Sequence, residues 1–394
     1  MRAHRRDQAS LIRRRRSGHS FRRVHHEHLY VHVPFCARRC VYCDFSIAVR
    51  AVVPVSEYLS AVDGELAARH GTESFRLKTL YFGGGTPSKL GASGVAALID
   101  LIRRRGEFAD AAEVTLEANP EDVTSASATA WRESGVNRVS LGVQSFDDAV
   151  LQWMHRTHNA AMAVSAVEIL RGAGIANVSI DLIFATPPDI EREWQRDLEA
   201  ALVLDVPHLS VYGLTIEPRT PLGRWVARRD TAEAGEDDFA AEFLAAHKAL
   251  TEGGYEHYEV SNYARAGHES RHNRAYWSRA AYAGVGPSAH EFDGSRRRWN
   301  LEAYVAWQLT AAGHADPVEG AEELSAEQAL AEEVYLGLRT DQGVQLEKSE
   351  VAGVAPWVDA GWARVEDSVV RLTALGWLRL DSLAVALTHV RSRY

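Results

Sequence analysis

The stretch LYVHVPFCARRCVYC, residues 29–43, decides the fold of this chain. It begins with β-branched and aromatic residues typical of a buried strand, and it ends in Cys36, Cys40 and Cys43, spaced C-x3-C-x2-C. The 394-residue chain has 3 cysteines in all, so they do not form a disulfide framework, which uses even numbers spread along a sequence. Clustered thiols indicate a metal or redox centre.

The three cysteine thiols limit which metal centre can form here. Soft thiolates select iron-sulfur clusters, zinc or Cu(I). A structural zinc site needs four closed ligands, and the fourth here would have to be a histidine such as His32. An ordinary 4Fe-4S cluster takes four cysteines, so three leave one iron open to another ligand. We expect the cluster, with zinc and unliganded thiols as the alternatives.

Further strand-like runs follow the first one at intervals that suit β-helix-β crossovers. These runs are residues 79–82 (TLYF), 113–117 (EVTLE), 138–143 (RVSLGV), 177–184 (NVSIDLIF) and 208–212 (HLSVY). The pattern predicts an α/β fold with six parallel βα units. Periodicity alone does not choose between an open doubly wound sheet and a barrel, but both place ligands at the carboxyl ends of the strands.

Polar and glycine residues stand at these predicted strand ends. Gly83, Gly84 and Gly85, followed by Thr86, come after the second run, and a glycine-rich turn lets the backbone approach a ligand closely. Glu117 ends the third run, Gln144 follows the fourth, and Asp181 lies in the fifth. Taken singly, each is also compatible with a tight turn or a polar residue at a strand end. Their convergence on one rim favours a ligand site.

The cysteine loop, with an aromatic residue before its last cysteine and six βα units around it, closely resembles the radical S-adenosylmethionine (SAM) superfamily. The resemblance implies a partial (β/α)6 barrel in which SAM occupies the open iron. An electron from the cluster then cleaves the sulfonium to a 5'-deoxyadenosyl radical. The GGGTP stretch resembles the family's SAM-binding turn. By resemblance to the porphyrin branch, SAM-contacting positions fall on Glu117, Gln144, Arg156 and Asp181.

The second half of the chain contains four further motifs, EVSNYA (259–264), GHES (267–270), HNRAYW (272–277) and GVGPSAH (284–290). Together they resemble the HemW-type haem chaperones, relatives of the oxygen-independent coproporphyrinogen III oxidase. The resemblance implies a haem site with His272 as iron ligand and with Tyr276 and Trp277 packed on the macrocycle. Arg271, Arg274 or residues 296–298 would pair with propionates. Spacing alone is more typical of a capped, packed turn than of a haem site.

Two departures favour the chaperone over the oxidase. The oxidase has a further cysteine two residues after the last cluster ligand, where this chain has Phe45, and it orders an N-terminal segment that here is an arginine-rich tail. Two further departures from the family pattern lie in the loop after the fifth strand and at the C-terminus. Residues 182–189 read LIFATPPD where the family reads LIxGLPGQ, and relatives continue through a glycine-containing wing beyond the end of this chain.

We therefore expect a radical SAM protein that binds haem and delivers it to apo-haemoproteins, including respiratory ones at the membrane surface. The alternative is radical decarboxylation of a porphyrinogen propionate to vinyl. A zinc-stabilised nucleic-acid binder using the arginine tail is a third hypothesis. The sequence does not decide whether the protein is catalytic or which client it serves. It also leaves open whether haem attaches covalently and whether the protein forms a homodimer.

Charge and composition define the expected domains. The net charge is −9, yet residues 1–28 hold nine arginines against one aspartate and one glutamate. This segment is predicted to be disordered, as an inert extension, a tail for anionic surfaces or a targeting peptide. The remainder is acidic, which argues against nucleic acid as the main ligand. Without a membrane-length apolar run or a signal sequence, a cytoplasmic location is expected.

The expected organisation has four parts. The arginine-rich extension is 1–28, the radical SAM core 29–230, a HemW-type extension with the candidate haem site 231–320, and a C-terminal helical, winged-helix-like cap 321–394.

Overall fold

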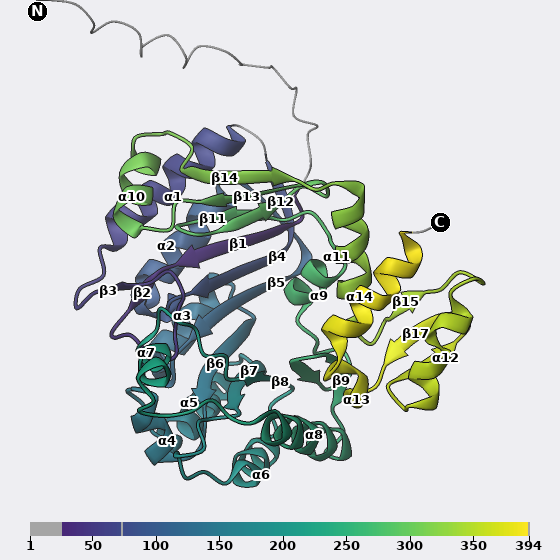
Figure 1. Ribbon diagram of the computed structural model, residues 1–394. Coiled ribbons are helices and arrows are strands. Elements are labelled where there is room, and N and C mark those ends of the chain that lie inside the picture. Colours follow the sequence, from purple (N-terminus) through teal and green to yellow (C-terminus); the bar gives the residue numbers. More distant parts are fainter. Residues whose placement is uncertain (1–25, 72–73, 393–394) are drawn as a thin grey trace, which may run out of the picture.

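A computed structural model describes residues 26–71 and 74–392 (Figure 1). All six predicted strands are confirmed, and they lie side by side and parallel in one sheet. They are β1 (His28–Val33), β4 (Phe75–Gly84), β5 (Gly106–Ala118), β6 (Arg138–Gln144), β7 (Asn177–Phe184) and β8 (His208–Gly213). The N-terminal extension as far as residue 25 lies outside the described residues, and His28 already belongs to β1.

Short strands extend the sheet at both edges. β11 (Ala283–Val285) pairs parallel with β1, whereas β10 (Asn262–Ala264) pairs antiparallel with both β8 and β9 (Glu256–Glu259). Within the described residues this gives a nine-stranded sheet of order β11-β1-β4-β5-β6-β7-β8-β10-β9.

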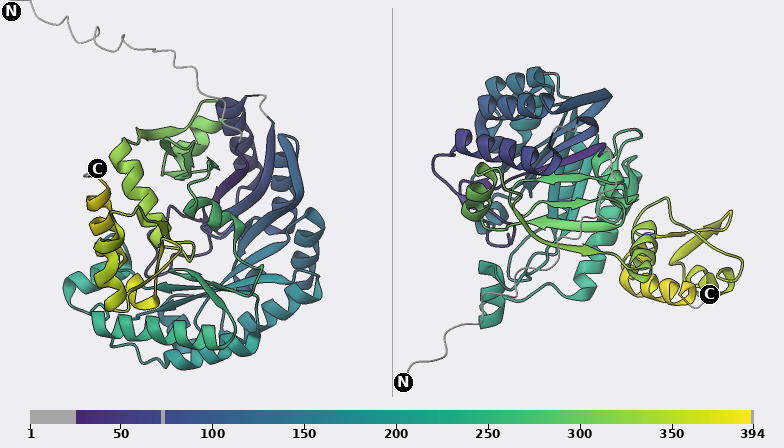
Figure 2. Two further views of the ribbon diagram at one scale, coloured as in Figure 1. Left: turned by 90° about the vertical axis from the view of Figure 1, so that its right-hand side faces the viewer. Right: turned by 90° about the horizontal axis from the view of Figure 1, so that it is seen from above.

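The sheet curls into a partial barrel with helices on its outer side (Figure 2, left). The connecting helices are α1 (Val55–His70), α2 (Gly91–Arg103), α3 (Ser125–Ser134), α5 (Ala160–Gly172), α6 (Trp194–Leu204) and α8 (Glu236–Glu252). The barrel, rather than the open doubly wound sheet, is therefore the fold, as the resemblance implied. All strand arrowheads of β1 and β4 point toward the same side in Figure 1, where the cysteine loop lies.

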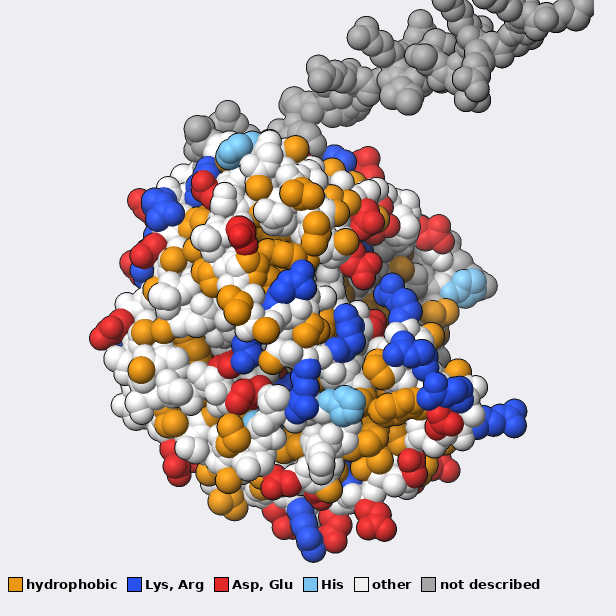
Figure 3. Space-filling view, turned by 90° about the vertical axis from the view of Figure 1, so that its left-hand side faces the viewer, with side chains coloured by type: hydrophobic (Ala, Val, Ile, Leu, Met, Phe, Trp, Pro, Cys, Tyr) orange, Lys and Arg blue, Asp and Glu red, His pale blue; other side chains and the backbone are white. Residues whose placement is uncertain are grey.

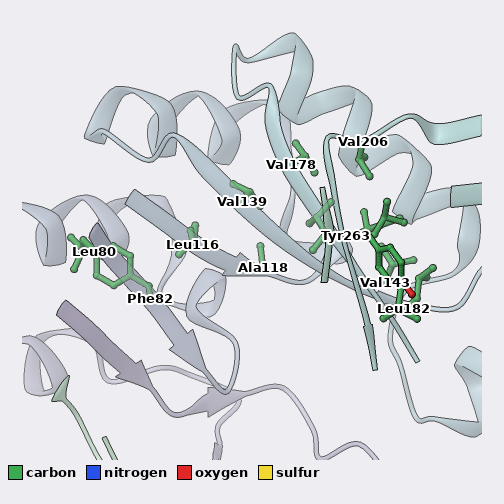
Figure 4. Close-up of a cluster of buried hydrophobic side chains, with 14 of the residues drawn as sticks. Leu80, Phe82, Leu116, Ala118, Val139, Val143, Val178, Leu182, Val206 and Tyr263 are labelled. Carbon is green, nitrogen blue, oxygen red and sulfur yellow. The ribbon is translucent and has the colours of Figure 1, made fainter. Parts of the chain in front are cut away.

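Strand periodicity separates the core from the site. Successive side chains of a strand point to opposite faces, so one set packs under the helices and the other faces the barrel interior. The helix-facing set is apolar and buried, as Leu80, Phe82, Leu116, Val139 and Val178 show (Figure 4). The alternate positions hold Tyr81, Glu117, Ser140, Asp181 and Ser210. The polar residues predicted at strand ends thus line the interior.

Shorter elements complete the carboxyl end of the barrel. β2 (Phe35–Cys36) and β3 (Ala48–Val49) pair at either end of the cysteine loop. The other elements there are η1 (Pro87–Leu90), η2 (Pro120–Asp122), α4 (Asp148–Trp153) and α7 (Pro221–Arg228). Beyond the barrel follow α9 (Arg271–Trp277), α10 (Tyr304–Ala312) and a sheet of β12 (His290–Phe292), β13 (Arg296–Asn300) and β14 (Val318–Glu323).

The buried carboxylate of Glu65 links the segment after the barrel to α1. Glu65 in α1 accepts hydrogen bonds from the Gly286 backbone at 3.0 Å, Asn300 at 2.6 Å and the Trp307 indole at 2.7 Å. Its charge is balanced by Arg69 at 2.9 Å. A buried charge that lost this partner would be strongly destabilising, so the network fixes how α1, β13 and α10 pack.

The C-terminal region is a small unit of helices and one antiparallel sheet. It contains α11 (Ala326–Leu338), β15 (Val344–Gln345), α12 (Val351–Asp359), β16 (Ala363–Glu366), β17 (Val369–Leu372), α13 (Ala374–Trp377) and α14 (Leu380–Arg391). The β16–β17 hairpin turns through Asp367 and Ser368, which both have positive φ. This hairpin beside helices gives the winged-helix-like cap. Over the ranges that the structure describes, every helix is too short or too polar to cross a bilayer.

Candidate functional site

The cysteine loop closes the carboxyl end of the barrel. A tight turn places the Cys43 N–H 3.3 Å from the Cys40 carbonyl, and the Arg39 guanidinium donates to the Cys43 carbonyl over 3.1 Å. All three thiols are free. Cys36, Cys40 and Cys43 line one cavity of about 360 Å³, so the loop presents them together to the barrel interior.

Two polar contacts reach the thiols from the turn after β4 and from the loop after α4. The Sγ of Cys36 lies 3.4 Å from the Thr86 hydroxyl, and that of Cys40 lies 3.5 Å from the Arg156 guanidinium. Burial raises the pKa of Cys36, and it raises the pKa of Cys43 to about 11. Without a metal these two groups are therefore protonated thiols at neutral pH. A metal centre would replace those protons, since thiolates are the binding form.

The arrangement fits a cluster better than a single ion. Among residues 26–71 and 74–392, no three Cys, His, Asp or Glu side chains converge closely enough to hold one metal ion. A 4Fe-4S cluster instead carries each thiolate on a different iron, which spaces the ligands more widely. His32, the alternative zinc ligand, uses one ring nitrogen toward the Tyr30 hydroxyl at 3.1 Å and the other toward the Ser46 carbonyl at 2.9 Å.

The glycine turn approaches the start of the cysteine loop so closely that no larger residue would fit there. Gly84 has φ +113°, and a Cβ on it would lie 2.6 Å from the His32 ring. A Cβ on Gly85 would lie 2.7 Å from the Pro34 backbone. Gly84, Gly85 and Thr86 line the cavity, but Gly83 does not. Gly83 instead leaves room for the rings of Tyr30 and Tyr81, so its contribution to the site is indirect.

Two carboxylates face the cavity from β5 and β7, the strands on either side of β6. Glu117 accepts hydrogen bonds from the Tyr81 hydroxyl at 2.8 Å and the Gly84 N–H at 3.1 Å, and Asp181 accepts one from Ser140 at 3.2 Å. Burial, then the charge of Asp181, raises the pKa of Glu117 to about 7. Burial also raises the pKa of Asp181 to about 6. The pair is suited to accept hydrogen bonds from the hydroxyls of a bound ligand.

Arg156 joins these groups to the cysteine loop. One guanidinium nitrogen donates to the Asn119 side chain at 2.7 Å and to the Gly142 carbonyl at 2.8 Å, while the other approaches Cys40. Gln144 lies on the same cavity wall, with φ +71° at the end of β6. Ten of the predicted SAM and cluster residues thus meet at one cavity, with Gly83 just behind it.

The predicted haem residues lie elsewhere, toward the amino-terminal ends of the strands. His272 is 1% exposed, with one ring nitrogen 2.6 Å from the Thr79 hydroxyl and the other 2.9 Å from the Tyr276 hydroxyl. Its ring stacks on Tyr81 at 5.0 Å between centroids. Burial lowers the pKa of His272 to about 3. In this conformation the imidazole is neutral, and both of its nitrogens already have partners.

Trp277 lies edge-on to Tyr276, with 6.5 Å between the ring centroids, and no ring contact joins it to His272 among the described residues. The guanidinium of Arg339 lies 4.4 Å over its ring, and Trp277 lines a second cavity together with Arg271 and Arg274. Residues 296–298 do not line either cavity. Arg297 instead pairs with Glu322 at 3.3 Å and with Glu332, and Arg298 pairs with Asp316. The structure thus places Arg271, Arg274 and Trp277 on the second cavity, while His272 and Tyr276 contact each other outside its lining.

Sequence reasoning missed several residues on the first cavity wall, including Tyr42, Asn119, His155 and Tyr212. Asn119 follows Glu117 by two residues, and Tyr212 stands at the end of the sixth strand, so the strand-end rule could have found both. His155 has no comparable signal because it lies in a loop with φ +61°.

The departure at residues 182–189 has a local backbone consequence. Ala185 stands where the family pattern has glycine, and it adopts φ +58°. Its N–H donates to Glu242 at 2.7 Å, which helps to hold this conformation. Asp181 still reaches the cavity, so the changed loop leaves the preceding carboxylate in place.

The molecular face at the mouth of the barrel is basic and partly apolar. Arg38, Arg39 and Arg50 of the cysteine loop region are exposed, and Phe45 is 62% exposed. On this face Lys and Arg side chains gather among hydrophobic ones, while Asp and Glu lie mostly toward the outline (Figure 3). The acidic chain therefore presents a locally cationic surface around its candidate cluster.

Comparison with known proteins agrees with this geometry. The sequence profile of the radical SAM superfamily matches residues 30–201. The protein named Heme chaperone HemW from Mycobacterium tuberculosis is 37% identical over 322 residues, covering 81% of this chain and 83% of that protein. Its Escherichia coli namesake is 38% identical over 66% of this chain and 69% of that protein. A mouse protein named Radical S-adenosyl methionine domain-containing protein 1, mitochondrial, is 35% identical, covering 80% and 74%.

Among solved structures, the coproporphyrinogen III oxidase HemN from Escherichia coli, described as a radical SAM enzyme, has the same fold. The TM-score is 0.79 at 20% identity, covering 93% of this chain and 90% of that one. The superfamily implies a 4Fe-4S cluster and SAM, which together supply one-electron reduction of the SAM sulfonium, and the cavity residues fit both groups. The chain therefore belongs to the radical SAM superfamily and, within it, to the HemW family.

Proposed function

We propose that this protein is a haem chaperone, which binds haem and delivers it to apo-haemoproteins. The observation that carries the proposal is the alignment with proteins named heme chaperones, which extends well beyond the radical SAM core into the second half of the chain. We propose a cytoplasmic location and membrane-bound respiratory haemoproteins as clients. A homodimer is part of the same hypothesis.

In this proposal, Cys36, Cys40 and Cys43 hold the cluster at the barrel mouth. Gly84, Gly85 and Thr86 contact the methionyl end of SAM through the exposed backbone of the turn. Glu117 and Asp181 accept hydrogen bonds from ligand hydroxyls. Gln144 and Arg156 complete the wall, and Arg156 also places a positive charge beside Cys40. Each role is supported by the side chain's position on one cavity.

The interior of the barrel confines a ligand to its carboxyl end. Below Glu117 the lumen is filled by aromatic rings, with Tyr30 stacked on Tyr81 at 6.1 Å and Tyr81 on His272 at 5.0 Å. The cavity above them, about 360 Å³, falls within the size range of small-molecule sites.

The experiment uses the full chain, purified without oxygen and with its cluster reconstituted. Haem is added, and binding is followed by the Soret absorbance. The complex is then mixed with membranes whose haemoproteins have been depleted of haem. The return of the absorbance of these haemoproteins measures the transfer. We expect binding followed by transfer that exceeds transfer from haem bound to serum albumin.

A parallel reaction contains coproporphyrinogen III, SAM and a reductant, and its products are separated by chromatography. The proposal predicts that no vinyl product forms. Vinyl product at many turnovers per chain would establish the oxidase instead, and failure to bind haem at all would contradict the chaperone.

A further inference from the structure

The side-chain hydroxyl of Thr86 contacts a cysteine sulfur. Its oxygen lies 3.4 Å from the Sγ of Cys36, and the hydroxyl has no other hydrogen-bond partner in the part of the chain that the structure describes. Thr86 is 5% exposed, so the contact is shielded from solvent. Buried hydroxyls are almost always hydrogen-bonded, and the partner of this one is a ligand of the candidate cluster.

The place of Thr86 in the chain would normally give this hydroxyl a different partner. Thr86 is the N-cap of η1, where a threonine side chain commonly accepts a hydrogen bond from an N–H of the first turn. The Thr86 side chain makes no such bond. Pro87 has no N–H to offer, and the N–H of Lys89 donates to the Thr86 carbonyl at 2.9 Å instead. The hydroxyl is therefore available to the cysteine.

The surrounding backbone holds both partners of this contact in place. On one side β2 pairs with β3, and the Cys36 carbonyl accepts from the Arg50 N–H at 3.1 Å. On the other side the Gly85 N–H, immediately before Thr86, donates to the Val33 carbonyl at 2.9 Å. A donor that is fixed in this way does not have to reorient when charge changes on its acceptor.

The chemistry of cluster binding decides which atom donates. In the free thiol, either the hydroxyl or the sulfur could be the donor. A cysteine binds iron as a thiolate, which carries no proton. The proton between the two atoms then belongs to Thr86, so its hydroxyl donates to the sulfur of Cys36.

Two of the cysteine sulfurs thus meet side-chain donors of different kinds. Cys36 has the neutral hydroxyl of Thr86, whereas Cys40 has the charged guanidinium of Arg156 at 3.5 Å. Hydrogen bonds to the sulfurs are among the features that set the reduction potential of an iron-sulfur cluster. The hydroxyl is the donor that a substitution of nearly equal size can remove without changing the charge of the site.

We propose that Thr86 raises the reduction potential of the cluster through its hydrogen bond to Cys36. The donated proton stabilises the greater negative charge that the sulfurs carry in the reduced cluster, so the cluster is easier to reduce. Thr86 is a positioning residue that acts through Cys36, and this role of its hydroxyl is separate from the contact of its backbone with SAM. The inference requires the cluster, but it does not depend on haem delivery.

The test is a redox titration of the full chain, with its cluster reconstituted and without SAM, followed by electron paramagnetic resonance. Thr86→Val replaces the hydroxyl with a methyl group, and Thr86→Ser keeps the hydroxyl. At a fixed solution potential, we expect the ratio of reduced to oxidised cluster to fall about threefold to tenfold in Thr86→Val, a lowering of about 30 to 60 mV for one electron. Thr86→Ser should keep the ratio of wild type.

Thr215→Val is the matched control, because Thr215 lines the same cavity and no hydrogen bond joins it to a thiol among the described residues. Its potential should equal that of wild type. A wild-type potential in Thr86→Val with a full cluster would overturn the inference. If Thr86→Val loses the cluster, Thr86→Ala, which removes the hydroxyl without adding a methyl group, is titrated in its place. Loss of the cluster in both variants, with Thr86→Ser intact, would give the hydroxyl a purely structural role and would also overturn the inference.

Discussion

The guanidinium of Arg156 lies 3.5 Å from the Sγ atom of Cys40, although 116 positions separate the two residues in the sequence. Two unit charges about 4 Å apart interact by roughly 1 kcal/mol in water and about 4 kcal/mol near a protein surface. A cation at this position stabilises the more negative, reduced state of a cluster bound by Cys40.

Arg156→Gln should therefore lower the reduction potential of the cluster, because the reduced state loses a favourable charge interaction. It should also weaken SAM binding, since Arg156 forms part of the cavity wall. A redox titration followed by electron paramagnetic resonance measures the first effect. Arg156→Lys, which keeps the charge, is the control, and an unchanged potential in Arg156→Gln would contradict the electrostatic role.

Glu117 should make the stability of the protein depend on pH. Its pKa is raised from 4.5 to about 7, so its contribution to stability is fully present below pH 4.5 and is lost as pH rises through about 7. One pKa unit corresponds to about 1.36 kcal/mol, so the loss is on the order of 1 to 3 kcal/mol. Urea unfolding without SAM, from pH 4.5 to 8, measures this loss.

Glu117→Gln should flatten that pH profile, leaving the slope due to Asp181 between about pH 4 and 6. Glu107→Gln removes an exposed carboxylate from the same strand and is the matched control. Equal profiles for wild type and Glu117→Gln would show that Glu117 titrates normally.

Gly84→Ala should destabilise the protein more than Gly91→Ala does. Both glycines have positive φ, but a Cβ at Gly91 meets nothing within 4 Å, whereas at Gly84 it meets the His32 ring at 2.6 Å. Backbone strain alone costs about 1 to 2 kcal/mol, which both variants incur. Thermal unfolding and SAM binding are the measurements, and equal losses in both variants would argue against a close-packed turn.

Ala185→Gly should stabilise the protein, unlike most changes to glycine. Ala185 has φ +58°, a conformation that glycine adopts without the Cβ penalty. We expect a gain of about 0.5 to 1 kcal/mol in urea unfolding, because the relief of strain exceeds the entropy that glycine adds to the unfolded chain. Ala173→Gly, at φ −81°, should be destabilising. A loss in both variants would mean that Ala185 is unstrained.

Local pattern was sufficient to predict the strands whose apolar residues face the helices, but not their full extent. β5 begins at Gly106, seven residues before the predicted start, because its first part (GEFADAA) carries too few apolar residues to be recognised. β11 was not predicted. Its Ala-Gly-Val sequence has little strand character, and only its pairing with β1 makes it a strand.

The candidate site residues were also predictable only in part. The rule that ligands meet at the carboxyl ends of parallel strands placed Cys36, Glu117 and Asp181 together, because that rule depends on topology alone. The positions of His272, Tyr276 and Trp277 depend instead on helix geometry and on tertiary packing. On a helix, His272 and Tyr276 are four residues apart and share a face, whereas Trp277 points about 100° away. No local signal showed that Thr79 would enclose His272.

The direct test of the account is the metal content of the natively purified protein. The chain is isolated without oxygen, iron, sulfide and zinc are quantified, and the dithionite-reduced sample is measured by electron paramagnetic resonance with and without SAM. We predict about four irons and four sulfides per chain, a signal that SAM alters, and loss of both in Cys43→Ser. Stoichiometric zinc without iron or sulfide, or a cluster signal that SAM leaves unchanged, would contradict it.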